Sequence, residues 1–177
     1  MRLVIVLATL ATLALVCGAG RADEKEEGFT PLFNSKDLTG WKTKAGESLE
    51  GKTEFSEKRF RVTDGLLVID EKVKGDLTIF TVKEFKGDVH LKFEFRPGPG
   101  CNNDIFFRGL KFDIKKPDVK NLKEGEWHEL EIVVKGDKAE VKCNGETMRT
   151  ANVKPSGNLG LRAEYGGITY RKLRIKE

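Results

Sequence analysis

Hydrophobic and polar residues alternate along much of this chain with a period of two, which is typical of β-strands with one buried face and one solvated face. The clearest case is the segment Val89–Arg96, where Val89, Leu91, Phe93 and Phe95 alternate with polar residues. The sequence PGPG follows and should end this strand, because proline lacks a backbone donor and glycine-rich runs favour turns. The densest apolar stretch outside the N-terminus therefore predicts a strand with a polar outer face.

The same alternation predicts about ten short strands joined by turns. Beyond the strand at 89–96, the expected strands are two within Phe60–Asp70, then Leu77–Val82, Asp104–Phe112, Trp127–Lys135, Ala139–Cys143, Glu146–Arg149, Gly157–Tyr165 and Ile168–Ile175. Asp64-Gly65 predicts a tight hairpin within the first pair. Polar stretches at 43–56 and 115–126 predict loops. Because no amphipathic helix of ten residues is expected beyond the N-terminus, the fold class is all-β, an antiparallel sandwich or barrel. Trp41 is expected to anchor the core, with a sugar-stacking role as the alternative.

The N-terminal 22 residues indicate a cleaved secretory signal helix. A basic start precedes the uncharged apolar run 3–16, which is too short for a stable membrane span. Cleavage is expected after Ala22, with Ala19 as the alternative; a lipid on Cys17 is disfavoured because Val16 is bulky. We therefore expect a signal peptide at 1–22, a charged leader at 23–28, one β-sandwich domain at 29–177, and export to the periplasm or extracellular space.

Charge and cysteine content restrict the partners of the mature chain. Loss of Arg2 and Arg21 with the signal lowers the formal net charge from +4 to +2, which is not the profile of a nucleic-acid-binding protein. No membrane span is expected in the mature chain. Cys101 and Cys143 remain, and in an exported protein they could form a disulfide, with two unpaired thiols as the alternative.

Few residue types are available for catalysis. His90 and His128 are the two histidines, each expected to be an exposed strand residue, and the sequence has no G-x-S-x-G nucleophile elbow. It also lacks the clustered Cys and His of zinc sites and the strand–glycine-loop–helix context of phosphate sites. Neither a metal nor a cofactor is therefore expected, with calcium held by loop oxygens as the alternative.

Carboxylates at polar strand positions are the remaining catalytic groups, since cleavage of a glycosidic bond uses such groups as acid, base or nucleophile. The candidate acids are Glu94, Asp104, Asp113 and Glu164, and the candidate cations are Arg96, Arg108 and Arg162. In a curved sandwich the polar face of one sheet forms a shallow groove. We expect Glu94 and Arg96 to lie on such a face together with Arg162 and Glu164. The alternative is that these side chains form ordinary cross-strand ion pairs.

Six segments occur in the order of the motifs of one known family. They are FTPLFNSKDLTGW, DGLL, FKGDVHLKFEFR, CNNDIFFRG, GEWHELEIVVKGDKAEVKCNGE and GNLGLRAEYGGITYRKLRIKE. Together they resemble the 3-keto-disaccharide hydrolase domain family. The resemblance implies a concanavalin A-like lectin/glucanase jelly roll, which is a β-sandwich of two antiparallel sheets.

The resemblance also implies hydrolysis of glycosides already oxidised to a ketone at C3. The ketone acidifies the C2 proton, so a base can remove it, the C1 leaving group departs by elimination, and water adds afterwards. This route needs a base near C2, an acid at the leaving oxygen and donors for the enolate.

The chain departs from the family pattern where the site is expected. The family's Ser-Gly after Asn102 is replaced by Asn103-Asp104, and its Gln and His near the C-terminus are replaced by Arg162 and Glu164. Its E-x-Q-x-x-D strand is reduced to a short segment that carries Asp113, while Glu94, Arg96, Asn102 and Arg108 are retained. From these positions we predict Glu164, Glu94 and Asp113 as catalytic residues. The predicted residues for binding a carbohydrate are Arg96, Asn102, Asn103, Asp104, Arg108 and Arg162. A non-catalytic sugar-binding sandwich is the alternative.

Overall fold

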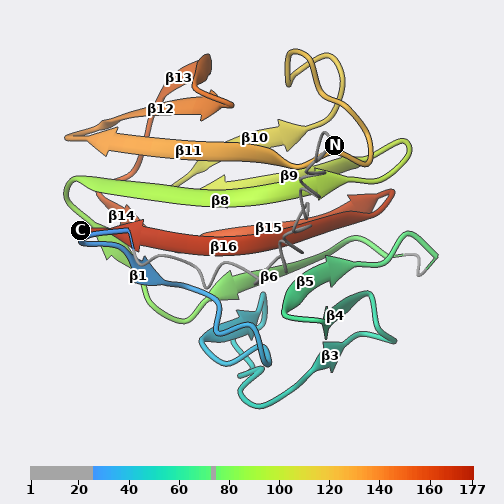
Figure 1. The fold of residues 1–177 in the computed structure, drawn as a ribbon. Coiled ribbons are helices and arrows are strands. Elements are labelled where there is room, and N and C mark those ends of the chain that lie inside the picture. Colours follow the sequence, from blue (N-terminus) through green and yellow to red (C-terminus); the bar gives the residue numbers. More distant parts are fainter. Residues whose placement is uncertain (1–25, 73–74) are drawn as a thin grey trace, which may run out of the picture.

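The protein is described by a computed structural model that covers residues 26–72 and 75–177. In these ranges the chain forms sixteen strands and no helix, so that no helix there could cross a membrane. Two antiparallel sheets lie one behind the other as two layers (Figure 1). The signal peptide predicted at 1–22 and the first residues of the leader lie outside the described residues.

The larger sheet has nine strands. Its order is β13 (Glu146–Asn152), β12 (Lys138–Cys143), β11 (His128–Lys135), β8 (Val89–Pro97), β16 (Ile168–Lys176), β5 (Leu66–Ile69), β4 (Phe60–Thr63) and β3 (Glu54–Phe55), with β1 (Thr30–Pro31) paired to β16.

The smaller sheet has five strands and carries the site described below. Its order is β10 (Leu110–Ile114), β9 (Asn102–Phe107), β15 (Leu159–Tyr165), β6 (Leu77–Thr81) and β2 (Trp41–Thr43). The short strands β7 (Phe85–Lys86) and β14 (Ser156–Gly157) pair separately. All pairings are antiparallel, which confirms the all-β, antiparallel prediction.

The core lies between the two layers and is built from the apolar positions of the alternating strands. Leu91, Phe93 and Phe95 of β8 are fully buried, as are Ile105 of β9 and other strand residues. Each such side chain contributes roughly 1.5–3 kcal/mol through the water-exposed area that it loses. The alternation therefore places the polar residues of each strand on the outer faces of the sandwich.

Trp41 is a core residue, as predicted. Its side chain is fully buried, and its indole Nε1 donates a hydrogen bond to the carbonyl of Leu32 at 3.1 Å. The polar end of the ring is thus satisfied while the rest packs in the core.

The predicted hairpin around Asp64-Gly65 is confirmed, because these residues join β4 to β5. Both have positive φ angles, 51° and 75°, as the tight turns of such hairpins require. The segment expected as one strand at 104–112 is divided into β9 and β10, because Arg108 and Gly109 also adopt positive φ angles of 50° and 85° and form a turn.

His128 is not the exposed strand residue that was expected; it is 4% exposed. It belongs to the inward-facing positions of β11, in phase with Leu130. Its ring stacks on Phe95 with 5.3 Å between centroids, and its Nδ1 lies 3.0 Å from Nδ2 of Asn144. His128 is therefore a hydrogen-bonded residue of the core.

The two cysteines are not bridged. Cys101 and Cys143 are both buried free thiols, so the disulfide considered from the sequence is absent. Cys101 precedes β9 of the smaller sheet, where its Sγ lies 3.5 Å from the carbonyl of Ile114, whereas Cys143 ends β12 of the larger sheet. The two thiols are therefore held by strands of different sheets.

Candidate functional site

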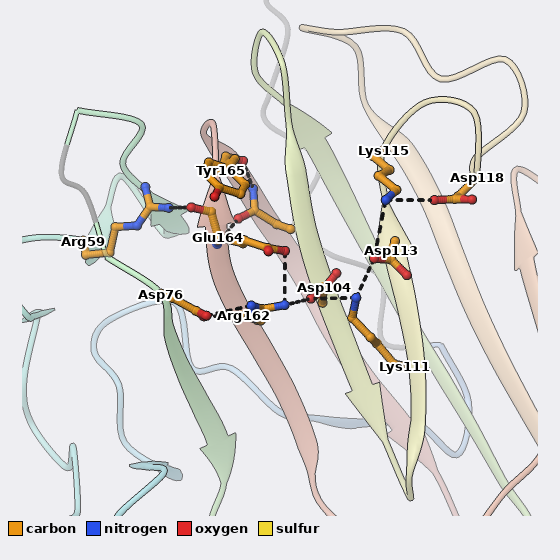
Figure 2. A network of polar contacts seen from close by, with 11 residues as sticks. Arg59, Asp76, Asp104, Lys111, Asp113, Lys115, Asp118, Arg162, Glu164 and Tyr165 are labelled. Carbon is orange, nitrogen blue, oxygen red and sulfur yellow. Dashed lines mark hydrogen bonds and ion pairs between the residues drawn. The ribbon is translucent and has the colours of Figure 1, made fainter.

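Charged side chains gather on the outer face of the smaller sheet (Figure 2). The strand register pairs Asp113 of β10 with Asp104 of β9, Asp104 with Arg162 of β15, and Arg162 with Thr78 of β6. These positions alternate with the inward-facing residues of the same strands, so the four side chains form a row across the sheet. We call Asp104, Asp113, Arg162, Glu164 and Lys111 the charged cluster.

Arg162 lies at the centre of the charged cluster. Its Nη1 is 2.6 Å from Oδ2 of Asp104 and 3.1 Å from Oε2 of Glu164. Its Nε and Nη2 donate to the two carboxylate oxygens of Asp76 at 2.7 and 2.6 Å. These hydrogen bonds, with Asp76 the largest contributor, raise the pKa of Arg162. The guanidinium therefore stays charged and holds three carboxylates in place.

Asp104 is a fully buried carboxyl group within this row. Burial raises its pKa, and the Asp113 carboxylate beside it acts in the same direction, against the contribution of Arg162. Its Oδ1 has no hydrogen-bond partner among the described residues. A carboxyl oxygen of this kind is suited to hold a proton.

The pKa of Asp113 is shifted in the opposite direction from that of Asp104. Burial is the largest single influence and acts to raise its pKa, but the hydrogen bonds from Lys111, whose Nζ lies 2.6 Å from Oδ1, and from Asp104, together with the charges of Lys111 and Lys115, outweigh it, and the pKa of Asp113 is lowered. Lys111 also lies 3.4 Å from Asp104 Oδ2. Two neighbouring carboxyl groups whose pKa values are pushed apart can serve as acid and base.

Glu164 is positioned by Asn103 of the neighbouring strand. Asn103 is fully buried; its Oδ1 accepts a hydrogen bond from the Glu164 backbone N–H at 2.8 Å, and its Nδ2 donates to the carbonyl of Tyr165 at 3.0 Å. The register of β15 shifts between Arg162 and Tyr165. Asn103 thus holds an irregular strand end, while the Glu164 side chain remains 22% exposed.

A second row of side chains lies on the same face, beside the row formed by Asp113, Asp104, Arg162 and Thr78. The register pairs Lys111 with Phe106, Phe106 with Gly160, and Gly160 with Phe80. Both phenylalanines are partly exposed. The outer face of the smaller sheet therefore offers aromatic surface next to charged groups, a combination that suits polar ligands with apolar patches.

Glu94 and Arg96 do not join this site. Both lie on the outer face of the larger sheet, because β8 belongs to that sheet. Arg171 lies 2.6 Å from Oε2 of Glu94 through its Nε, and the guanidinium groups of Arg171 and Arg96 lie 3.9 and 4.9 Å from the Trp127 ring centroid. The prediction that Glu94 and Arg96 share one groove with Arg162 and Glu164 is therefore wrong.

Arg108 and Asn102 flank the charged cluster. Arg108 is 3% exposed, and its guanidinium donates to the carbonyls of Lys154 and Gly87 at 2.7 and 2.6 Å, so it ties the β9–β10 turn to two other segments. Asn102 begins β9 opposite Tyr165. Among the described residues, neither side chain forms a hydrogen bond or an ion pair with the charged cluster.

Sequence reasoning missed four contributors, namely Asp76, Lys111, Phe80 and Phe106. Lys111 is two residues from Asp113 and Phe106 is two residues from Asp104, so each lies on the same strand face as a predicted site residue. The alternation could therefore have indicated both. Phe80 lies on β6 and Asp76 directly precedes that strand. Nothing in the sequence shows that β6 lies beside β15. Across the described ranges, no group of three or more His, Cys, Asp or Glu side chains is arranged to hold a metal ion.

Comparison with known proteins identifies the family. Residues 28–121 and 111–176 match the family described as the 3-keto-alpha-glucoside-1,2-lyase-like domain, and the chain belongs to this family. No match is found among curated proteins.

Solved structures share the fold. A proposed glycosyl hydrolase from Parabacteroides distasonis is 19% identical with a TM-score of 0.65, over 85% of this chain and 94% of that one. The carbohydrate-binding module CBM66 from Bacillus subtilis is 14% identical with a TM-score of 0.53, over 79% and 97%. A B. subtilis protein of unknown function with a galectin-like fold is 11% identical with a TM-score of 0.58, over 84% and 94%.

Proposed function

We propose that this member of the 3-keto-alpha-glucoside-1,2-lyase-like family is an exported protein that binds a carbohydrate on the outer face of its smaller sheet and cleaves a 3-keto-glycoside there. The observation that carries the proposal is the convergence of Asp104, Asp113 and Glu164 with Arg162 and Lys111. The family assignment supplies the substrate class, and the cluster supplies the acid, base and cation that an elimination needs.

Glu164 is the proposed base, because its carboxylate is partly exposed and its backbone N–H is held by Asn103. It would take the C2 proton, which the neighbouring ketone acidifies. The negative charge that develops on the ketone oxygen would be stabilised by Arg162 and Lys111, whose side chains are 20% and 43% exposed.

The leaving group requires a proton. As the C1–O bond breaks, its electron pair passes to the leaving oxygen, which would take a proton that Asp104 holds and that Asp113 passes on. Asp104 is fully buried, so Asp113, with 22% of its side chain exposed, is the member that can touch the substrate. Water then adds across the C1–C2 double bond, with hydroxide at C1 and a proton at C2, and yields the free 3-keto sugar.

A second candidate function is sugar binding without cleavage. One contact favours it: the Glu164 carboxylate already lies 3.1 Å from the Arg162 guanidinium. If this ion pair persists when a sugar is bound, Glu164 cannot act as the base, and the face would serve as a binding surface.

The experiment is an assay of 3-keto-sugar release from a panel of 3-keto-glycosides. Glu164→Gln keeps the shape of the side chain and removes the base, so the rate should fall by at least about 100-fold. Glu94→Gln is the matched control on the larger sheet and should retain wild-type activity. Binding of the panel without any release would favour the second function, and equal rates for wild type and Glu164→Gln would contradict the proposed base.

A further inference from the structure

A pocket of about 430 Å³ opens beside the charged cluster. It is lined by Phe80 and Phe106, by three cationic residues, and by small or neutral residues including Thr78; the cations are Lys44, Arg108 and Lys154. None of the described residues that line it is acidic. The pocket therefore combines aromatic surface with an excess of positive charge.

The aromatic surface depends on a glycine. A Cβ at position 160 would lie 2.6 Å from Cε1 of Phe80 and 3.2 Å from Cβ of Phe106, so the ring of Phe80 lies against the bare backbone of β15. The register sets Phe80 and Phe106 on the two sides of Gly160. Rings held in this way present apolar surface to the pocket, and the apolar face of a sugar ring can stack on such surface.

The positive charge is not neutralised within the pocket. Arg108 is 3% exposed, and its guanidinium donates to two backbone carbonyls rather than to a carboxylate. The stem of Lys154 packs over Gly109, where a Cβ would come within 3.2 Å of its Cγ. The charge of Lys44 helps to lower the pKa of Asp76. Both oxygens of that carboxylate are, however, hydrogen-bonded to Arg162. Arg108 is therefore a buried cation without a carboxylate partner among the described residues, and Lys44 and Lys154 add exposed positive charge to the same pocket, so a bound anion would be favoured here.

We propose that this pocket binds a sugar ring that carries an anionic group, either a carboxylate or a sulfate. The ring stacks on Phe80 and Phe106, and the anion lies near Lys154 and Lys44. The inference rests on the proposed function only in placing a carbohydrate on this face. It adds that the substrate is an acidic glycoside, with its charged unit beside the Phe80 and Phe106 rings rather than in the charged cluster.

The test is calorimetry of the full chain with glucose, glucuronate and glucose 6-sulfate as probes. At low salt we expect at least one acidic sugar to bind about tenfold more tightly than glucose, and this preference should fall as salt is added. Lys154→Gln should remove most of the preference, whereas Lys138→Gln, an exposed lysine on β12 of the larger sheet, should leave it unchanged. Phe80→Leu should weaken the binding of each sugar that binds by about fivefold, whereas Phe55→Leu on β3 should not.

Each outcome decides the proposal. A preference for glucuronate or for glucose 6-sulfate supports it and identifies the anion. Equal affinity for all three sugars, absence of binding, or a preference that Lys154→Gln does not change overturns it. The wild-type salt dependence decides the matter if a variant fails to fold. Because binding and turnover are separate readouts, a protein that prefers acidic sugars but releases no 3-keto sugar contradicts only the proposed cleavage.

Discussion

Asp104 and Asp113 face each other across neighbouring strands, with Asp113 of β10 directly opposite Asp104 of β9. One carboxyl is fully buried and has a raised pKa, and the other is paired with Lys111 and has a lowered pKa. A pair of this kind holds one proton more readily than two or none. The proposed chemistry and the pH dependence of folding both follow from this arrangement.

The raised pKa of Asp104 should make the protein less stable as pH rises. Because the folded state keeps a proton that the unfolded chain releases, the free energy of unfolding falls as pH increases from the ordinary value of 3.8 through the raised value. Asp113, whose pKa is lowered, has its effect below 3.8, where stability is lost as pH falls. Asp104→Asn should therefore reduce the loss of stability on raising the pH above 3.8.

Urea unfolding at a series of pH values measures this effect. Asp137→Asn, at an exposed position in the turn between β11 and β12, is the control and should follow the wild-type curve. A wild-type pH dependence in Asp104→Asn would mean that Asp104 is ionised like an ordinary surface aspartate.

Asn103→Ala should destabilise the protein by about 2 kcal/mol, because it removes the two hydrogen bonds that this fully buried side chain makes to the Glu164 N–H and the Tyr165 carbonyl. It should also reduce activity, since Glu164 loses its support. Asn102→Ala is the comparison: its Oδ1 is buried without a partner among the described residues, so little should be lost. Denaturant unfolding of both variants tests this, and equal costs would argue against the role given to Asn103.

Gly160→Ala should displace the Phe80 ring, since the new Cβ would meet it at 2.6 Å. We expect a loss of stability of about 1 kcal/mol, because overpacking is costly but a partly exposed ring can turn away. In a Phe80→Leu background the cost should shrink, and a double-mutant cycle from urea unfolding measures that coupling. Additive costs would show that the ring and the glycine do not contact each other as described.

The thiols of Cys101 and Cys143 should be unreactive in the folded protein. Burial raises the pKa of each to about 11, and the thiolate is the reactive form. Mass spectrometry after alkylation near neutral pH should find neither residue modified until the protein is unfolded. Both should then react without a reductant; failure to react under those conditions would indicate a disulfide.

Much of the fold was predictable, because strand alternation reports directly which face is buried. The alternation of β8 and the Asp64-Gly65 hairpin are local signals, and both led to correct elements. His128 shares the inward phase of Leu130, so the same signal could have placed it in the core. The polarity of histidine favours an exposed position, but here Asn144 satisfies one of the ring nitrogens, so that the residue can be buried.

The site was only partly predictable, because it depends on which strands share a sheet. Glu94 and Glu164 occupy similar polar positions, yet β8 and β15 belong to different sheets, and alternation within one strand carries no information about its neighbours. Of the family motif positions, the retained Glu94 and Arg96 lie with Trp127 on the larger sheet. The replaced positions 104, 162 and 164 lie together on the smaller sheet.

The most direct test of the central claim is amide chemical-shift mapping by NMR, with a 3-keto-glycoside titrated into the Glu164→Gln variant so that the ligand persists. We predict that the largest changes fall on β9, β10 and β15, around Asp104 and Arg162. Changes confined to β8 and β16, around Glu94 and Trp127, or no changes at all, would contradict the placement of the carbohydrate site on the smaller sheet.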